Sequence, residues 1–130
     1  MKDLIVTSRA FKNGEMIPKK YTCKGGDVNP PLEIKGIPAE AKSLALIMDD
    51  PDAPVGTWVH WVVWNIPLEG VEKVIAENSA PGIEGINSAG KHHYHGPCPP
   101  SGVHRYYFKF YALNAMLNLA TSIAKRVIER

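Results

Sequence analysis

Five polar side chains have the types and the spacing for acid-base chemistry or for binding an anion. Asp50 and Asp52 follow the apolar residues 44–48, within the turn sequence Asp50-Pro51-Asp52-Ala53-Pro54. An apolar run of that length predicts a buried strand, so the two carboxylates stand where that strand ends. The prolines fix φ and donate no ladder hydrogen bond, so we expect a stiff turn. In extended backbone Asp50 and Asp52 fall on one side and Asp49 on the other.

His60 lies early in the next expected strand, residues 58–66. Alternation places it on one face with Trp58, Val62 and Trp64, and the opposite face carries Val59, Trp61, Val63 and Asn65. Both faces are otherwise apolar, apart from Asn65, which predicts an interior strand. A histidine on such a face is usually a core residue with satisfied hydrogen bonds. Its position just after the acidic turn favours a functional role.

His104 and Tyr106 open the last expected strand, residues 104–113. Alternation puts them on the same face as Phe108 and Phe110, and the other face carries Arg105, Tyr107, Lys109 and Tyr111. If this strand and the His60 strand are neighbours, both histidines and Tyr106 converge on the acidic turn. Nearby carboxylates would then raise the pKa of His60 and His104 and make imidazolium donors available. The alternative is that Tyr106 is an amphipathic edge of the core and His104 binds a carbonyl.

Histidine and cysteine also occur outside this group, and neither forms a recognisable metal motif. His92, His93 and His95 stand close together in a loop, but no acidic or thiol ligand lies at a metal-binding spacing. We therefore favour a solvated histidine cluster and expect no metal. Cys23 and Cys98 favour free thiols in a reducing compartment, while a disulfide between them stays open.

Length and composition predict one globular domain spanning residues 1–130. The chain has 130 residues, 11 glycines, 11 prolines and 45% hydrophobic residues, which is typical of a β-rich protein with many turns. The net charge of +2 is small and its basic residues are scattered, which argues against nucleic-acid binding. Charge interrupts the N-terminus too early for a signal peptide, and no apolar run reaches membrane-spanning length. These features predict a soluble, cytoplasmic protein.

The pattern predicts a mainly β fold with irregular connections. We expect irregular loops at residues 19–31 and 76–103. The second loop is rich in glycine and proline, and an ordered loop of that length is more often the wall of a site than a spacer. Strands are expected at residues 4–7, 32–34, 44–48, 58–66, 71–75 and 104–113.

Taken together, these motifs resemble the phosphatidylethanolamine-binding protein family, also called the Raf kinase inhibitor protein family, and most closely its bacterial and archaeal branch. The resemblance runs from about residue 11 to residue 113 and is specific in combination, although Asp-Pro-Asp alone would be weak. The motifs that carry it are Tyr21-Thr22-Cys23-Lys24-Gly25, Asn29-Pro30-Pro31-Leu32, Asp50-Pro51-Asp52-Ala53-Pro54, Trp58 with His60, and residues 96–106 from Gly96 to Tyr106.

The resemblance implies an antiparallel-rich β-sandwich with a small surface cavity for phosphate-like anions and phospholipid head groups. It assigns that cavity to Asp50, Asp52, His60, His104 and Tyr106, with Ala53, Pro54, Gly96 and Pro97 as walls. We expect no cofactor. It also suggests a role as an inhibitor or regulator of a protein kinase or protease.

The sequence departs from the family pattern after residue 113. Family members usually continue with a loop, a helix and a last strand, whereas apolar residues within 114–130 recur here at helical spacing. One short C-terminal helix would leave a sheet edge uncovered, which favours a homodimer.

Three functions therefore compete. The first is a non-catalytic binding protein for phosphorylated small molecules or phospholipid head groups, and the second is a kinase or protease regulator. The third is a hydrolase in which the same Asp and His residues hold a metal or perform acid-base chemistry. No serine or cysteine is recognisably paired with a base, which argues against an enzyme.

Overall fold

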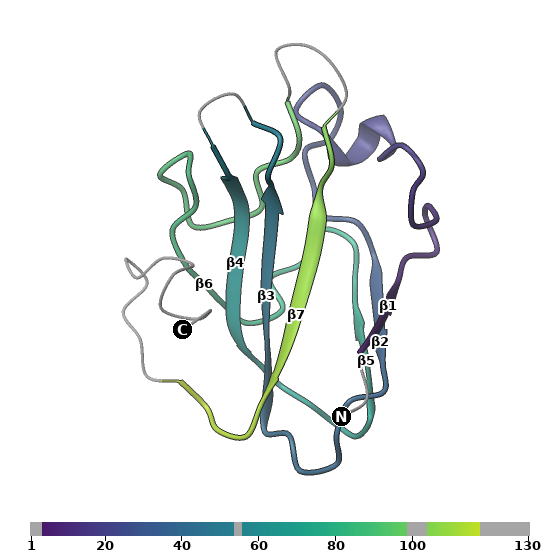
Figure 1. Cartoon of the computed structure of the whole chain (residues 1–130), viewed down its shortest axis with the longest axis vertical. Helices are drawn as coiled ribbons and strands as arrows, with labels where there is room; N and C mark the ends of the chain where they lie inside the picture. The colour runs from purple at the N-terminus through teal and green to yellow at the C-terminus, as the bar shows by residue number, and fades with distance from the viewer. Residues whose placement is uncertain (1–3, 54–55, 99–103, 118–130) are drawn as a thin grey trace.

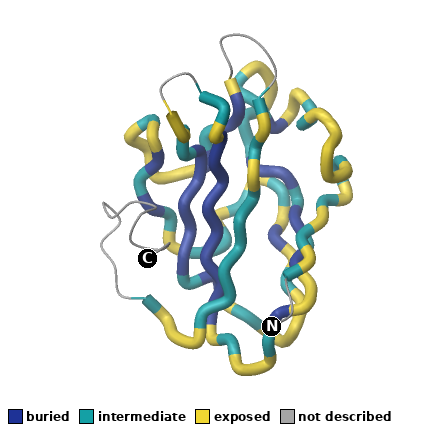
Figure 2. Tube along the Cα trace, viewed as in Figure 1, coloured by how far each residue is buried: buried dark blue, intermediate teal, exposed yellow. Residues whose placement is uncertain are grey.

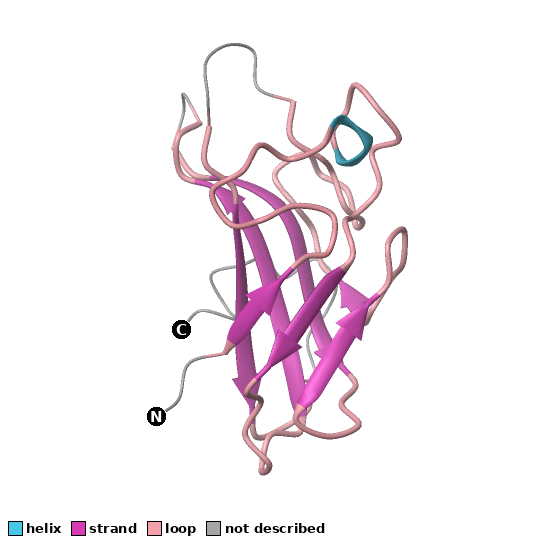
Figure 3. Cartoon of the chain, turned by 90° about the vertical axis from the view of Figure 1, so that its right-hand side faces the viewer, coloured by secondary structure: helices cyan, strands magenta, loops and turns pink. Residues whose placement is uncertain are grey.

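Two antiparallel β-sheets face each other in a sandwich in the computed structural model (Figure 1; Figure 3). The structure describes residues 4–53, 56–98 and 104–117. The mainly β fold and its antiparallel sheets confirm the expected fold class. The elements in chain order are β1 (Ile5–Thr7), the short 3-10 helix η1 (Lys19–Tyr21), β2 (Leu32–Lys35), β3 (Ser43–Asp50), β4 (Trp58–Ile66), β5 (Glu72–Ile75), β6 (Ile83–Glu84) and β7 (Tyr107–Leu113).

The larger sheet carries the expected site residues. Its strand order is β6-β4-β3-β7, and the smaller sheet has the order β1-β2-β5. All eight residues of β3 are buried, which agrees with a central strand covered on both faces. Figure 2 shows the buried residues concentrated along β3 and β4. Because β4 and β7 both pair antiparallel with β3, the start of β4, which carries His60, and the start of β7, which Tyr106 directly precedes, lie at the same end of the sheet.

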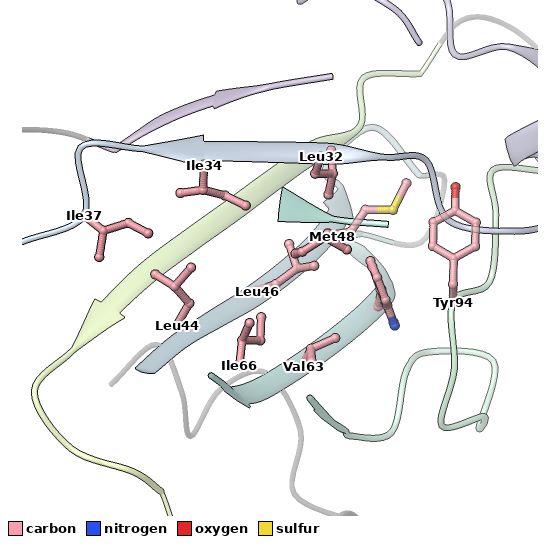
Figure 4. Packing of buried hydrophobic residues seen from close by; sticks show 11 residues of the cluster. Leu32, Ile34, Ile37, Leu44, Leu46, Met48, Val63, Ile66 and Tyr94 are labelled. Atoms are coloured by element: carbon pink, nitrogen blue, oxygen red, sulfur yellow. The ribbon is translucent and has the colours of Figure 1, made fainter. Parts of the chain in front are cut away.

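The main core lies between the two sheets. Leu32 and Ile34 of β2 face Leu44, Leu46 and Met48 of β3 across this core (Figure 4). Phe108 and Phe110 of β7 pack against it, as alternation predicts. A second cluster lies on the opposite face of the larger sheet and contains Ala45, Val62 and Trp64. This two-sided burial keeps β3 and β4 rigid beneath the site.

A β-bulge in β4 places His60 differently from simple alternation. Met48 pairs with Trp61 and Asp49 with Val59, so His60 is an extra residue in the ladder. Val59 consequently packs in the same cluster as Val62, and His60 turns toward Tyr106 on the core side of the sheet. The prediction that His60 shares a face with Val62 and Trp64 is therefore wrong.

Other differences concern the irregular segments. The expected loop at 76–103 contains the short strand β6, and the loop at 19–31 begins with η1. The expectation of free thiols is wrong, because Cys23 and Cys98 form a disulfide. Most of the expected C-terminal helix lies outside the described residues, and residues 114–117 are not helical. The described part of the chain contains no helix long and apolar enough to cross a membrane.

Candidate functional site

The candidate site lies at the end of the larger sheet, where β3 ends and β4 and β7 begin (top of Figure 1). The antiparallel pairing of these strands brings together side chains that are far apart in the sequence. The ring of Tyr106 lies 5.5 Å from that of His60 and 6.4 Å from that of His104, measured between ring centroids. His104 in turn contacts Asp50. Four of the expected site residues thus form one cluster.

His104 and Asp50 form a buried hydrogen-bonded pair. The His104 Nδ1 to Asp50 Oδ2 distance is 2.6 Å, and the two side chains are 9% and 4% exposed. The other carboxylate oxygen of Asp50 accepts the amide hydrogen of Asp52 at 2.8 Å. With both oxygens engaged, Asp50 fixes the orientation of the His104 ring, which is the role that a carboxylate takes beside a functional imidazole.

Asp52 is bound to Arg105 rather than directed at the two histidines. Its carboxylate accepts the Arg105 amide hydrogen and two guanidinium hydrogen bonds, each at 2.8 Å. The side-chain and backbone hydrogen bonds from Arg105 lower the pKa of Asp52 to about 2. Asp52 therefore fastens the acidic turn to the segment before β7 and holds His104 and Tyr106 in register with Asp50.

His60 is buried and held by the 87–95 loop. Its ring Nδ1 lies 2.6 Å from the His95 carbonyl oxygen, and because a carbonyl accepts, Nδ1 carries the hydrogen. The His95 amide donates back to the His60 carbonyl at 3.2 Å. Burial lowers the pKa of His60 and outweighs the favourable contributions of the His95 hydrogen bond and the carboxylates of Asp50 and Asp49. The prediction of a raised pKa for His60 is thus wrong.

Tyr106 has a buried hydroxyl with no hydrogen-bond partner among the described residues. Burial, together with the charges of Asp50 and Asp52, raises the pKa of Tyr106 to about 12. The side chain therefore keeps its hydrogen at physiological pH and is a donor. Buried polar atoms without partners are rare in folded proteins, so this hydroxyl requires an explanation.

Asn87 organises the loop that holds His60, and sequence reasoning missed it. Its Nδ2 donates to the carbonyls of His60 and His93, at 3.1 and 2.9 Å. Its Oδ1 accepts the amides of Ala89 and Lys91, both at 3.0 Å. The sequence Asn87-Ser-Ala-Gly indicates a turn. It does not reveal that the turn residue is buried against the strand.

The expected walls at residues 96 and 97 are buried. The Gly96 amide donates to Asp27 Oδ1 at 2.7 Å, and a Cβ at this position would overlap the Tyr21 carbonyl and the Asp27 carboxylate. The Pro97 carbonyl accepts the Cys23 amide at 3.2 Å, next to the disulfide. The wall is thus fastened to residues 21–27. Ala53 lies in the acidic turn, where its carbonyl accepts the Gly56 amide at 3.1 Å, and Pro54 lies outside the described residues.

The remaining histidines differ in their surroundings. His92 and His93 are exposed, in agreement with the solvated loop that the sequence predicts. His95 is half-buried, and its ring stacks on that of His60 at a centroid distance of 6.2 Å. Within the described residues, no group of three His, Cys, Asp or Glu side chains is placed to hold a metal ion.

A cleft of about 780 Å³ adjoins the cluster on the side of the N-terminal segment. Pro97, His104 and Tyr106 border it at one end. The rest of the lining comes from residues 6–8, 11 and 13–17, from Thr22 and Leu32, and from Arg105 and residues 107–109. Among the described residues, Asp50, Asp52, His60 and Gly96 do not line this cleft, whereas His104 and Tyr106 of the cluster do.

Comparison with known proteins identifies the family of this chain. The family model for phosphatidylethanolamine-binding protein matches residues 7–130. The chain belongs to the phosphatidylethanolamine-binding protein family. The match extends beyond residue 113, where the motif resemblance ends, and includes the atypical C-terminal segment.

Relatives and solved structures support the family assignment. The chain is 48% identical to a UPF0098 protein of Pyrococcus abyssi, over 98% of this chain and 76% of that protein. A crystal structure of a phosphatidylethanolamine-binding protein homologue from Chlamydia trachomatis has a TM-score of 0.89 and 41% identity, and covers 97% of this chain and 86% of that one. Escherichia coli YbcL, described as a member of the mammalian family, has a TM-score of 0.86 and 29% identity over 98% of this chain and 88% of its own.

Proposed function

We propose that this protein is a non-catalytic binding protein for a small phosphate-like group, either a free phosphorylated molecule or a phospholipid head group. The observation that carries the proposal is the buried Tyr106 hydroxyl, which has no acceptor among the described residues. It stands beside His60 and beside the His104–Asp50 pair. A phosphate oxygen would supply the missing acceptor, and O–H donors make their strongest hydrogen bonds to ionised oxygens.

The protonation states favour a ligand that carries both acceptors and a donor. Tyr106 donates, whereas neutral His60 uses its Nδ1 hydrogen on His95 and presents Nε2 as an acceptor. A hydrogen phosphate monoanion offers an acceptor to Tyr106 and a hydroxyl to His60. A phosphoethanolamine zwitterion offers its ammonium instead. Dianionic phosphate would complement Tyr106 and His60 less well, because it has no hydrogen to donate to His60.

Affinity for a ligand whose only donor is its phosphate hydroxyl should fall as pH rises. At high pH the ligand loses its phosphate proton and His60 stays neutral, so two acceptors would face each other. At lower pH either the ligand or the His60 imidazole carries the hydrogen that joins them. Binding is therefore coupled to retention or uptake of a proton.

Calorimetric titration of chelator-treated protein with inorganic phosphate, at about pH 6 and about pH 8, tests the proposal. Wild type should bind more weakly at the higher pH. His104→Gln should lose affinity by tenfold or more, since about 1.4 kcal/mol corresponds to tenfold. His92→Gln is the matched control, because His92 is exposed in the nearby loop. Absence of binding at both pH values, or equal loss in both variants, would contradict the proposal.

A hydrolase remains the second candidate, and the short buried contact between His104 and Asp50 is the observation in its favour. A carboxylate-oriented histidine is the arrangement that a general base requires. An assay with p-nitrophenyl phosphate separates the hydrolase from the binding protein. Release of p-nitrophenol is measured once with chelator and once with added divalent metal. Turnover that His104→Gln abolishes would replace the binding proposal with the enzyme.

Regulation of a protein kinase or protease is a finer proposal that the family resemblance supplies. If the partner presents a phosphorylated residue to this site, phosphoethanolamine should compete with it. The corresponding test is a pull-down of this protein by an immobilised phosphopeptide, with phosphoethanolamine added as the competitor.

A further inference from the structure

We propose that the Cys23–Cys98 disulfide is a reactive redox site that a dithiol from another molecule reduces, and that its state sets the affinity of the candidate site for phosphate. The bond joins two segments that lie 75 residues apart in the sequence. The effect on affinity rests on the proposed function, whereas the reactivity of the bond does not. Separate measurements therefore test the two parts.

Cys98 carries the sulfur that an attacking thiolate can reach. It is exposed, whereas Cys23 is half-buried and the two residues before Cys98, Gly96 and Pro97, are buried. Exposed disulfides are the labile and regulatory ones, while structural disulfides resist reduction. Attack on Cys98 Sγ therefore requires no opening of the fold.

The reduction proceeds by two thiol–disulfide exchanges. A thiolate of the dithiol attacks Cys98 Sγ and forms a mixed disulfide, and Cys23 leaves as a thiolate that takes up a proton. The second thiolate of the dithiol then attacks its own sulfur in the mixed disulfide and releases Cys98, which is protonated in turn. Two electrons and two protons pass to the protein, which gains two thiols, and the dithiol becomes a disulfide.

Cys23 lies on a segment that its own hydrogen bonds hold in place. The Thr22 carbonyl accepts the amides of Gly25 and Asp27, both at 3.1 Å. The Thr22 hydroxyl donates to the Lys19 carbonyl at 2.8 Å. A Cβ on Gly25 would overlap the Lys19 carbonyl, so the segment packs closely on η1. This side of the disulfide should keep its conformation after reduction.

Residues 95–98, on the other side, connect the disulfide to His60. The His95 carbonyl accepts from His60 Nδ1 at 2.6 Å. The amide of the next residue and the carbonyl of the one after it bind the 21–27 segment, at 2.7 and 3.2 Å. The disulfide adds a covalent bond at Cys98, directly beside the longer of these hydrogen bonds. Reduction removes the covalent restraint and should weaken that hydrogen bond first.

A loosened 95–98 segment should lower affinity for phosphate. The His95 carbonyl fixes the His60 ring. Pro97 borders the cleft beside His104 and Tyr106. A ring or a wall that samples several orientations has to be ordered when the ligand binds, and this ordering costs free energy.

The reduced protein should stay folded. In the part of the chain that the structure describes, neither cysteine belongs to the clusters that pack the two faces of the larger sheet. The hydrogen bonds between residues 94–97 and the 21–27 segment also remain after reduction, including the bond from the Tyr94 hydroxyl to the Tyr21 carbonyl at 2.7 Å. The expected change is therefore local.

Reactivity is tested on the folded protein with dithiothreitol, by alkylating free thiols and counting them by mass spectrometry. The rate of reduction should lie within about tenfold of the rate in urea, because no unfolding is needed. Removal of the dithiol and addition of oxidised glutathione should restore the bond. Reduction that occurs only in urea would overturn the proposal. So would loss of the β-sheet circular dichroism signal on reduction, because the bond would then be a structural support.

Affinity is tested by calorimetric titration with inorganic phosphate. Oxidised wild type should bind about tenfold more tightly than reduced wild type and than the double variant Cys23→Ser, Cys98→Ser. Dithiothreitol should leave the double variant unchanged, which makes it the matched control. Because coupling is reciprocal, saturating phosphate should favour the disulfide over the dithiol form by the same factor. Equal affinity of the oxidised and reduced wild type would overturn the link to the site.

The His60 imidazole resonance separates failure of this inference from failure of the proposed function. It should shift on reduction, while the resonance of exposed His92 stays in place. If neither redox form binds phosphate, the proposed function fails, and a His60 shift would still support coupling between the disulfide and the site. A His60 resonance that does not move on reduction would overturn that coupling.

Discussion

At the scale of single residues, Tyr106 carries the free-energy argument for a ligand. Its hydroxyl has lost water without gaining a partner among the described residues, which costs about 1–3 kcal/mol. A phosphate oxygen at this position would recover that cost only in the bound state. If the proposal holds, the unpaired hydroxyl lowers the stability of the unbound protein and raises its affinity for the ligand.

Tyr106→Phe removes this hydroxyl and little else. Because the unpaired polar atom is lost, the free energy of unfolding should stay equal or rise, by up to about 1 kcal/mol. Affinity for phosphoethanolamine should fall by about tenfold. Urea denaturation and calorimetry measure the two quantities.

Tyr107→Phe is the control for that substitution. The Tyr107 hydroxyl accepts from Arg105 at 3.2 Å and the residue is 41% exposed, so its loss should leave phosphoethanolamine affinity unchanged. A clear loss of stability in Tyr106→Phe without loss of affinity would show that the hydroxyl has a structural role and does not bind the ligand.

His60 should make stability depend on pH. Its folded-state pKa is lowered by burial, so between that value and the usual value of about 6.5 the unfolded chain binds a proton that the folded chain does not. The His60 contribution is therefore fully present above about pH 6.5 and is lost as the pH falls below it. Denaturation curves measured at intervals from about pH 8 to about pH 5 should show this decline.

Denaturation curves of two variants over the same pH range test whether His60 causes the decline in stability. His60→Gln should flatten part of the decline, and His92→Gln should retain it because His92 is exposed. An unchanged slope in His60→Gln would mean that another group causes the decline.

At the scale of elements, the disulfide joins the segment that follows Tyr21 to the segment that follows Pro97. Cys23 and Cys98 are separated by 75 residues, and closing a loop of that length removes much chain entropy from the unfolded state. The double variant Cys23→Ser, Cys98→Ser should lose about 4 kcal/mol of unfolding free energy by this chain-entropy argument. Reductant should produce a similar loss in wild type and none in the double variant. Equal stability of the oxidised and reduced proteins would contradict it.

Strand positions follow from local sequence, whereas the bulge and the loops do not. The β4 segment 58–66 is predictable because apolar residues continue without interruption between turn signals. The inward position of His60 depends on the pairing of Met48 with Trp61 and of Asp49 with Val59, which no local pattern encodes. Strand β6 has only two residues and forms because it pairs with Val63 and Trp64 of β4.

The candidate site shows the same division between local and tertiary information. The sequence indicates the convergence of His104, Tyr106 and Asp50 only on the condition that their strands are neighbours, and the pairing of β3 with β4 and β7 meets that condition. The lowered pKa of His60 depends on its burial. The ion pair of Asp52 depends on Arg105, which is 53 residues away in the sequence. The disulfide likewise depends on the approach of two loops. Each of these misses is a tertiary contact that sequence spacing does not determine.

At the scale of the whole molecule, the larger sheet ends at β7 in the described part of the chain, so this edge is one place where another chain could pair. The expected homodimer remains a prediction. Size-exclusion chromatography with light scattering at micromolar concentration should give twice the chain mass of 14.3 kDa. A single species at the chain mass would contradict it, without affecting the phosphate site.

The most direct test of the phosphate site is an NMR titration that observes the imidazole nitrogens of all five histidines in the intact protein. Phosphoethanolamine is the titrant, and single His→Gln variants assign the signals. We predict that the His60 and His104 resonances shift together with one saturation curve, while those of exposed His92 and His93 stay in place. Shifts confined to His92 and His93, or no saturable shift at His60 and His104, would contradict the proposal that this buried cluster binds the anion.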